Sequence, residues 1–334
     1  GIMYQKLDTP YACANPILLL SFNRLDTLKR VLQIIESVRP SKIYLANDGA
    51  RENKIYPNGI SEKEQVHSVR NFLIDSISHF DFPCEVKTRF LDSNLGCKKA
   101  VSSAISWFFE NEEQGIILED DCLPTLSFFR FCDELLEKYK MQHNVFMISG
   151  WSALDFAQNT SVETLSPKAR LQEDYYFSKY NHIWGWASWA RAWSKYQLEF
   201  NENEIKTLHN FCSTKEKHYW YHIFKTYAQG KIDTWDYPWT YNIWKHNGLC
   251  IYPKNNMISN IGFNRVDAAH TTGDSKFVSM PSYELCFPLT HPKTIKQNSN
   301  LDKANFHIIF NTLPLHKRIL VKLKRTYKKY FNLM

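Results

Sequence analysis

The stretch Pro16-Ile-Leu-Leu-Leu-Ser-Phe22, followed by the polar pair Asn23-Arg24, decides the fold class of this 334-residue chain. A short, uninterrupted apolar run is typical of a strand that is buried on both faces of a parallel sheet. Asp26 is then expected to cap a helix, because apolar residues recur behind it at helical spacing: Leu28, Val31, Leu32 and Ile35. The order of strand, polar turn and helix is that of a βα unit.

The same order repeats up to about residue 150. Apolar runs predict further strands at 43–47, 85–91 and 115–118, and helical patterns cover 61–80 and a segment that ends near 110. Polar clusters follow the strands: Asn23/Arg24, Asp48 and Asp120/Asp121. This alternation predicts an α/β fold with a Rossmann-like, mainly parallel central sheet and helices on both faces. Ligands then bind at the carboxyl ends of the strands.

Composition indicates a folded, aromatic-rich chain. Hydrophobic residues make up 44% and aromatic residues 15%, with only 11 Gly and 13 Pro, which excludes disordered and collagen-like classes. The formal net charge is +7, but residues 316–334 alone hold seven Lys or Arg and no acid. The rest of the chain is therefore neutral, and we expect no nucleic-acid partner.

The basic segment divides cleanly on a helical wheel. Its apolar residues fall on one side and its seven basic residues on the other; the apolar set is Ile319, Leu320, Leu323, Tyr327, Tyr330 and Phe331. A basic amphipathic helix of this kind, over 316–331, is suited to an anionic membrane surface. The alternative is a helix packed on the body of the protein with a solvated basic face.

The cysteine spacing and the hydropathy of the chain indicate its cellular compartment. The eight cysteines include no C-x-x-C pair, which favours free thiols in a reducing compartment. No apolar run approaches the roughly 20 residues that cross a bilayer, and the N-terminus lacks the order of a secretion signal. We expect a cytoplasmic protein that is peripheral on the inner face of the cytoplasmic membrane through residues 316–331.

The acidic cluster Glu119-Asp120-Asp121 directly follows the predicted strand at 115–118. Crowded carboxylates raise each other's pKa unless a cation compensates, so a divalent metal is one explanation of the cluster. Hard oxygen ligands favour Mg²⁺ or Mn²⁺. A solvated acidic turn is the alternative.

The segment Leu118–Phe129 resembles the acidic metal motif, with its following double-aromatic helix, of GT-A glycosyltransferases. The likeness is to the N-acetylglucosaminyltransferase I type and to bacterial family-2-like nucleotide-diphospho-sugar transferases. Further matches to the family come in the same order along the chain: Ser21–Arg24, Asn47–Gly49, Asn94-x-Gly96, Trp184–Trp189 and Ile261–Thr271. The resemblance covers residues 16–272.

The resemblance implies site residues for a nucleotide-sugar donor. Those for the base, ribose and diphosphate are Ser21, Phe22, Asn23, Arg24, Asp48, Asn94, Gly96, Lys98, Glu119 and Asp120, with Lys99 as an alternative to Lys98. Asp121 and His270 would hold the metal, and Trp184, Gly185 and Trp186 would contact the acceptor or sugar. The alternatives from the residues alone are a ligand-free Asp48-Gly49 turn, an Arg24 that is a surface cation or pairs with an acid, and surface lysines.

An inverting reaction needs a carboxylate that takes the proton of the acceptor hydroxyl. Asp236, in Trp235-Asp-Tyr-Pro-Trp239, resembles the residue that carries this role in the family. Asp233, Glu173 and Asp174 are alternatives. Asp236 could instead cap a helix at 237–246.

Together these features predict a metal-dependent GT-A glycosyltransferase. It would move a sugar from a UDP-sugar, with inversion, to a glycan or lipid-linked glycan of a bacterial surface polysaccharide. Residues 1–150 would form the nucleotide-sugar half of one domain, 151–275 its acceptor-binding half, and 276–334 an extension with the basic helix. The alternatives are a sugar-phosphate nucleotidyltransferase and a membrane-attached glycan-binding protein without enzymatic activity.

Overall fold

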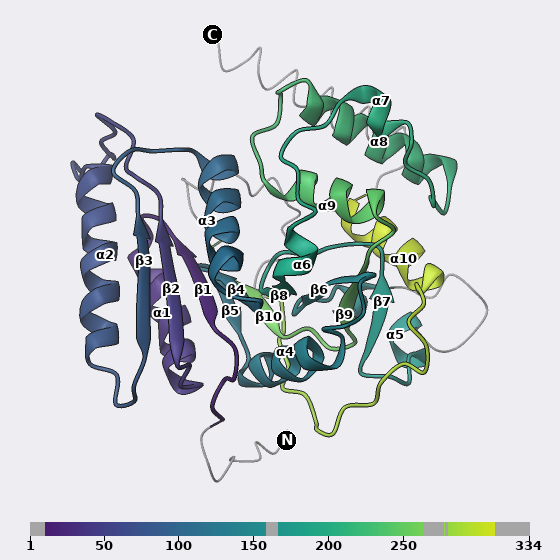
Figure 1. Cartoon of the computed structure of the whole chain (residues 1–334), viewed down its shortest axis with the longest axis horizontal. Coiled ribbons are helices and arrows are strands. Elements are labelled where there is room, and N and C mark those ends of the chain that lie inside the picture. Colours follow the sequence, from purple (N-terminus) through teal and green to yellow (C-terminus); the bar gives the residue numbers. More distant parts are fainter. Residues whose placement is uncertain (1–10, 158–165, 263–276, 278–279, 311–334) are drawn as a thin grey trace.

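The computed structural model describes residues 11–157, 166–262, 277 and 280–310 (Figure 1). At its centre lies an eight-stranded sheet in the order β3-β2-β1-β4-β8-β6-β9-β7. The strands are β1 (Ile17–Ser21), β2 (Lys42–Asn47), β3 (Glu85–Phe90), β4 (Gln114–Glu119), β6 (Val145–Ser149), β7 (Tyr175–Ser178), β8 (Trp186–Trp189) and β9 (Leu249–Pro253). Strands β8 and β7 run antiparallel to their neighbours, and the other pairs are parallel. The predicted α/β fold with a mainly parallel sheet is confirmed.

Helices cover both faces of the sheet. Figure 1 shows α2 and α3 on opposite sides of strands β1 to β3. The helices of the first half are α1 (Leu25–Ser37), α2 (Glu62–Ser78), α3 (Cys97–Asn111) and α4 (Leu126–Lys138). Those that follow are α5 (Pro167–Arg170), α6 (Ala190–Trp193), α7 (Glu202–Ile205), α8 (Thr214–Ala228), α9 (Asp236–Lys245) and α10 (Ser299–Asn305). A 3₁₀ helix covers Leu154–Phe156, and a short π-helix covers Phe306–Phe310. The sheet takes strands from both sides of residue 150.

A second, two-stranded sheet lies beside the end of β4. Strand β5 (Cys122–Pro124) pairs antiparallel with β10 (Ile258–Asn260), so that Cys122 faces Asn260. The Ile261 N–H then donates to the Asp121 carbonyl at 2.8 Å. This pairing carries the chain that follows β10 across the acidic cluster, a long-range arrangement that the sequence did not predict.

The start of α1 differs from the prediction. Asp26 does not cap this helix, because the N-cap residue is Arg24 and its side chain makes no capping hydrogen bond. Asp26 lies instead in the first turn, where the helix dipole favours a negative charge. In α2 the cap is present, since Ser61 Oγ accepts from the Glu64 N–H at 3.1 Å.

The tryptophans mainly build the core. Eight of the ten are buried, and Trp107 and Trp184 are only partly buried. Trp186, Trp193, Trp235 and Trp239 form one cluster, with ring centroids 5.1–6.4 Å apart. Packing therefore accounts for the eight buried tryptophans, whereas the side chain of Trp184 is only partly covered.

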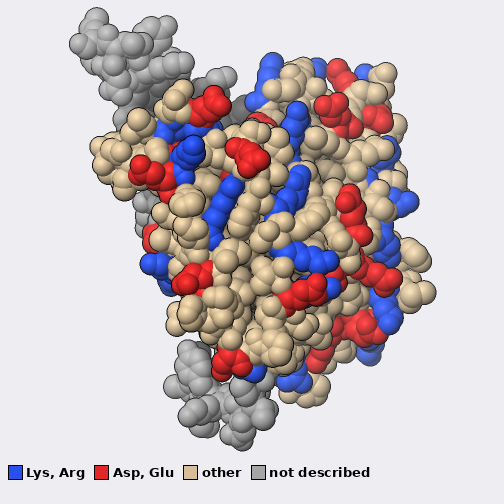
Figure 2. Space-filling model, turned by 60° about the vertical axis from the view of Figure 1, so that its left-hand side comes forward, with Lys and Arg blue, Asp and Glu red and all other residues tan. Residues whose placement is uncertain are grey.

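The eight cysteines are all free, as the sequence predicted. Figure 2 shows basic and acidic side chains interspersed over one face of the described structure, without a broad patch of one sign. Among the residues described, no helix is both long and apolar enough to cross a membrane. The predicted basic helix at 316–331 lies outside the described residues and stays a prediction.

Candidate active site

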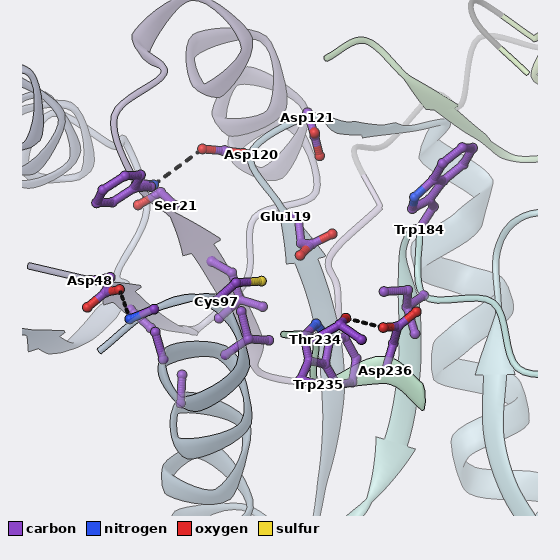
Figure 3. Close-up of a pocket in the computed structure, with 18 of the residues that line it drawn as sticks. Ser21, Asp48, Cys97, Glu119, Asp120, Asp121, Trp184, Thr234, Trp235 and Asp236 are labelled. Carbon is purple, nitrogen blue, oxygen red and sulfur yellow. Dashed lines mark hydrogen bonds between the residues drawn. The ribbon is translucent and has the colours of Figure 1, made fainter. Parts of the chain in front are cut away.

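A cavity of about 770 Å³ lies at the carboxyl ends of β1, β2 and β4. Strand ends and α3 form one wall, and the segments 181–184 and 233–237 form the other. Figure 3 shows Ser21 and Asp48 on one side, Trp184 and Asp236 on the other, and the acidic cluster between them. Twelve of the predicted site residues line this cavity: Ser21, Phe22, Asn23, Arg24, Asp48, Asn94, Gly96, Glu119, Asp120, Asp121, Trp184 and Asp236.

The acidic cluster is crowded and buried. Asp120 and Asp121 are only 5% and 8% exposed. One ligand atom each of Glu119, Asp121 and Cys122 lies within 4.8 Å of the others. Burial, followed by the charges of the neighbouring carboxylates, raises the pKa of Glu119 well above its usual value and that of Asp120 to about 7. Positive charge at this point would therefore be strongly favoured.

Arg24 supplies one positive charge from within the chain. Its Nη2 lies 3.0 Å from Asp121 Oδ2 and 3.8 Å from Asp120 Oδ1, and its Nη1 donates to the Gly262 carbonyl at 3.5 Å. A Cβ at Gly262 would lie 2.6 Å from Asp121 Oδ2 and 2.7 Å from Arg24 Nη1. A side chain at Gly262 would displace these groups, so the backbone passes close to the pair here. Arg24 is part of the acidic site and not an isolated surface cation.

The Asp48 carboxylate binds donors of the protein itself in this structure, whereas the prediction made it an acceptor for the base or ribose. Its carboxylate accepts from the N–H groups of Gly49, Leu95 and Gly96 and from Asn94 Nδ2, at 2.8–3.1 Å. A carboxylate offers about four lone-pair sites, so these bonds occupy it fully. Burial raises the pKa of Asp48, although three backbone N–H groups oppose that effect. Asp48 therefore holds the loop before α3 in place, which is closer to the turn interpretation.

A further group of residues that line the cavity comes from the loop between β2 and α2. The fully buried Glu62 binds Arg51 Nη2 at 2.7 Å and the Tyr56 hydroxyl at 2.6 Å, and Asn23 Nδ2 donates to that hydroxyl at 2.9 Å. Arg51 and Tyr56 both line the cavity. Sequence reasoning missed them because the loop has no periodicity, and side-chain contacts of Glu62 and Asn23 hold it at the cavity.

The opposite wall presents Trp184 beside a neutral histidine. The His182 ring stacks on Trp151 at 3.7 Å between centroids, and its Nδ1 accepts from the Trp184 N–H at 3.4 Å. Burial lowers the pKa of His182 to about 3, so the ring is uncharged at neutral pH. Asn181, His182 and Ile183 line the cavity, and the sequence analysis named none of them.

Gly185 and Trp186 do not line the cavity, unlike Trp184 in the same predicted segment. Trp186 is 1% exposed and stacks on Trp235 at 5.8 Å, so its ring belongs to the core. Gly185 is buried with φ +77°, a conformation that glycine adopts at little cost. The predicted contact of Gly185 and Trp186 with the acceptor or sugar therefore gains no support from the cavity lining.

Asp236 faces the cavity as the first residue of α9. It does not cap this helix, because the N-cap is Trp235. Its Oδ1 accepts from Thr234 Oγ1. Asp233 also lines the cavity and is exposed. Asp174 instead accepts from the Thr290 N–H at 2.6 Å, and neither it nor Glu173 lines the cavity.

Two further predicted site residues are not among those that line the cavity. Lys98 lies in the first turn of α3 but does not line the cavity, and its Nζ lies 4.6 Å from the centre of the Tyr227 ring. The structure thus directs it to an aromatic face of α8. His270 lies outside the described residues, so its role as a metal ligand stays a prediction.

Comparison with known proteins gives limited matches. No family model matches the chain, and the search of curated proteins found no relative. HddC from Yersinia pseudotuberculosis is 15% identical in its complex with GMP-PN (TM-score 0.25) and 14% without it (TM-score 0.26), over 40% of this chain and 56% of HddC. Residues 1–349 of S. aureus TarS are 9% identical, with a TM-score of 0.33, over 61% of this chain and 53% of TarS. The matched region thus spans little more than half of these structures.

Proposed function

We propose that this chain is a glycosyltransferase of the GT-A type that uses a nucleotide-diphosphate sugar. One observation carries the proposal: the cavity sets an acidic cluster with its own arginine, at the carboxyl ends of parallel strands, opposite a wall that holds an aromatic ring and a carboxylate. In open α/β sheets ligands bind at this end of the strands. A diphosphate needs the charged surface, and a sugar needs the wall with the aromatic ring and the carboxylate.

The chemistry of the acidic cluster suits a divalent cation. Its ligand atoms are mainly hard carboxylate oxygens, which favour Mg²⁺ or Mn²⁺ over softer metals. Asp121 would hold the ion, with Glu119 beside it, and the resemblance adds His270. When bound, the ion would neutralise the negative charge of the diphosphate leaving group.

Three residues of the chain would bind the phosphate, contact the sugar and accept the proton. Arg24, already at the acidic cluster, would pair with a phosphate oxygen, because a guanidinium binds such groups through paired N–H donors. Trp184 offers a half-buried ring against which the apolar face of a sugar can pack. Asp236 would take the proton of the acceptor hydroxyl, which gives inversion by single displacement.

The substrate classes follow from the resemblance and from the basic segment of the sequence. We propose a UDP-sugar as donor and a glycan or lipid-linked glycan of a bacterial surface polysaccharide as acceptor. Residues 316–331 would place the enzyme on the anionic inner face of the cytoplasmic membrane.

Calorimetric titration with UDP, with and without Mn²⁺, tests the proposal. We expect UDP binding that requires Mn²⁺ in the wild type and that is lost in Asp121→Asn, because the amide keeps the shape but not the charge. The matched control is Asp75→Asn, which removes a carboxylate that is 78% exposed on α2. Wild-type protein that binds no UDP with Mn²⁺, or an Asp121→Asn variant that binds it normally, would contradict the proposal.

A further inference from the structure

The turn that leads into α9 presents two polar side chains to the cavity, one on each side of a buried residue. Thr234 and Asp236 line the cavity, and Figure 3 shows both beside Trp235. Trp235 is 2% exposed, and its ring centroid lies 5.8 Å from that of Trp186 and 6.3 Å from that of Trp193. The core therefore fixes the residue that lies between the two side chains.

A hydrogen bond also fixes the backbone of this turn. The Tyr196 hydroxyl donates to the Trp235 carbonyl at 2.8 Å, and the Tyr196 ring stacks on Trp193 at 4.1 Å between centroids. Burial raises the pKa of Tyr196, so this hydroxyl keeps its proton and stays a donor. The relative placement of Thr234 and Asp236 is thus set by packing in the core.

The Thr234 hydroxyl donates to Asp236 Oδ1, as the dashed line in Figure 3 shows. An ionised carboxylate can only accept, so the hydrogen of this bond belongs to Thr234. Threonine is branched at Cβ, which restricts rotation about χ1 and makes its hydroxyl a donor of defined direction. The bond therefore restricts the rotation of the Asp236 carboxylate and favours its ionised form.

Six titratable groups lie around Asp236, and none of them is a cation: Cys97, Glu119, Tyr196, Tyr227, Asp233 and Tyr237. Burial raises the pKa of the cysteine and of the three tyrosines, so these four groups are uncharged at neutral pH. The six groups thus offer no positive charge to Asp236. The hydrogen bond from Thr234 and the dipole at the start of α9 do favour a negative charge there.

We propose that Thr234 is a positioning residue for proton transfer, because its hydroxyl holds the Asp236 carboxylate ionised and in one orientation at the cavity wall. The inference rests on the proposed function and adds to it a residue that acts through Asp236. In that reaction the acceptor oxygen bonds to the anomeric carbon and loses its proton to Asp236. The bond from that carbon to the diphosphate breaks, and the diphosphate leaves with the electron pair.

¹³C NMR of the full chain, labelled at the side-chain carboxyl carbon of aspartate, measures the pKa of Asp236 without any substrate. Its resonance is the one that Asp236→Asn removes. Thr234→Val keeps the branched shape but lacks the hydroxyl. We expect it to raise the pKa of Asp236 by about 1 to 2, which is about 10- to 100-fold tighter proton binding. Thr234→Ser keeps the donor and should leave this pKa close to that of the wild type.

Hydrolysis of UDP-glucose and UDP-N-acetylglucosamine with Mn²⁺, in which water is the acceptor, measures the effect on the reaction. The rate should fall at low pH as Asp236 is protonated, and in Thr234→Val this fall should begin at a higher pH by the same amount. A merely structural role would lower the rate without moving the pH profile. Calorimetry should show an unchanged affinity for UDP, because Thr234 acts on the proton acceptor.

Thr240→Val is the matched control on the same wall. Its hydroxyl contacts Asn181 Oδ1 at 2.6 Å and the backbone carbonyl of Asp236 at 3.2 Å. Removing this hydroxyl should change neither the pKa of Asp236 nor the pH profile. If Thr234→Val fails to fold by thermal unfolding, the comparison of Thr234→Ala with Thr234→Ser decides in its place.

Three results would overturn the inference while the proposed function stands: an unchanged pKa in Thr234→Val, an equal rise in Thr240→Val, or an equal rise in Thr234→Ser. If UDP binds but neither donor is hydrolysed, the NMR titration alone decides. Wild-type protein that binds no UDP and hydrolyses neither donor with Mn²⁺ would overturn the proposed function, and the inference with it.

Discussion

Glu62→Gln is the substitution whose cost follows most directly from the structure. Glu62 follows the N-cap Ser61 as the first residue of α2, and its side chain is fully buried. Its two oxygens accept from the backbone N–H, Nε and Nη2 of Arg51 and from the Tyr56 hydroxyl, at 2.6–3.0 Å. These bonds hold the loop between β2 and α2 against the cavity.

Burial alone would raise the pKa of Glu62, but Arg51 and Tyr56 outweigh it and lower the pKa from 4.5 to about 2. That difference corresponds to about 3 kcal/mol of stability at neutral pH. The Arg51 side chain is 54% exposed, which screens its part of the pair. We therefore expect Glu62→Gln to lower the free energy of unfolding by about 2 kcal/mol at pH 7.

The sign of the pH dependence follows from the lowered pKa. The folded state keeps Glu62 ionised more readily than the unfolded state, so its contribution is complete above pH 4.5 and is lost as the pH falls toward 2. Urea unfolding of wild type and Glu62→Gln at pH 7 and at pH 3 measures this, because the difference between the two proteins should shrink on acidification. Glu64→Gln, an exposed acid in the same turn, is the control. A loss below 0.5 kcal/mol at pH 7, within the usual scatter of surface substitutions, or a difference that grows at pH 3, would refute the reasoning.

Three further predictions concern the proposed enzyme. Asp236→Asn should lower transfer by about 10² to 10⁴ while UDP binding persists, and the anomeric configuration of the product, read by NMR, should be opposite to that of the donor; near-normal turnover would move the role to Asp233. Gly262→Ala should weaken Mn²⁺-dependent UDP binding in calorimetry, because its Cβ would lie 2.6 Å from Asp121 Oδ2; unchanged affinity would mean that the backbone shifts freely. Truncation after residue 312 should abolish binding to anionic vesicles at low salt and preserve UDP binding; vesicle binding by the truncated chain would place the membrane contact elsewhere.

The strands and long helices were predictable because each leaves a local pattern. The apolar run at 16–22 contains β1, and apolar spacing indicated α1, although the predicted cap Asp26 lies two residues after the observed N-cap Arg24. The pairing of β5 with β10 was not predictable, since each strand has three residues and their partners lie more than 130 positions apart. A strand of three residues has too few positions to show a period of two.

Site residues were predictable where charged side chains come directly at the end of a strand, as they do at Glu119–Asp121. It was not predictable where a long-range contact decides the role of a side chain. Nothing local to Asp48 shows that the loop at 94–96 will occupy its carboxylate. Likewise, the repeated tryptophans at 184 and 186 look alike in sequence, although one borders the cavity and the other lies in the core.

The charges around the cavity limit how a donor can bind. Glu119, Asp120 and Asp121 lie close together, and Arg24 is the cation held among them in this structure. A diphosphate that approached this cluster alone would meet like charge, whereas a divalent ion alone would compete with Arg24 for Asp121. In the proposed complex the ion would bind the carboxylates and the diphosphate would bind the guanidinium, so each ligand would remove an obstacle to the other. Metal and nucleotide should therefore raise each other's affinity, and linkage requires the two factors to be equal.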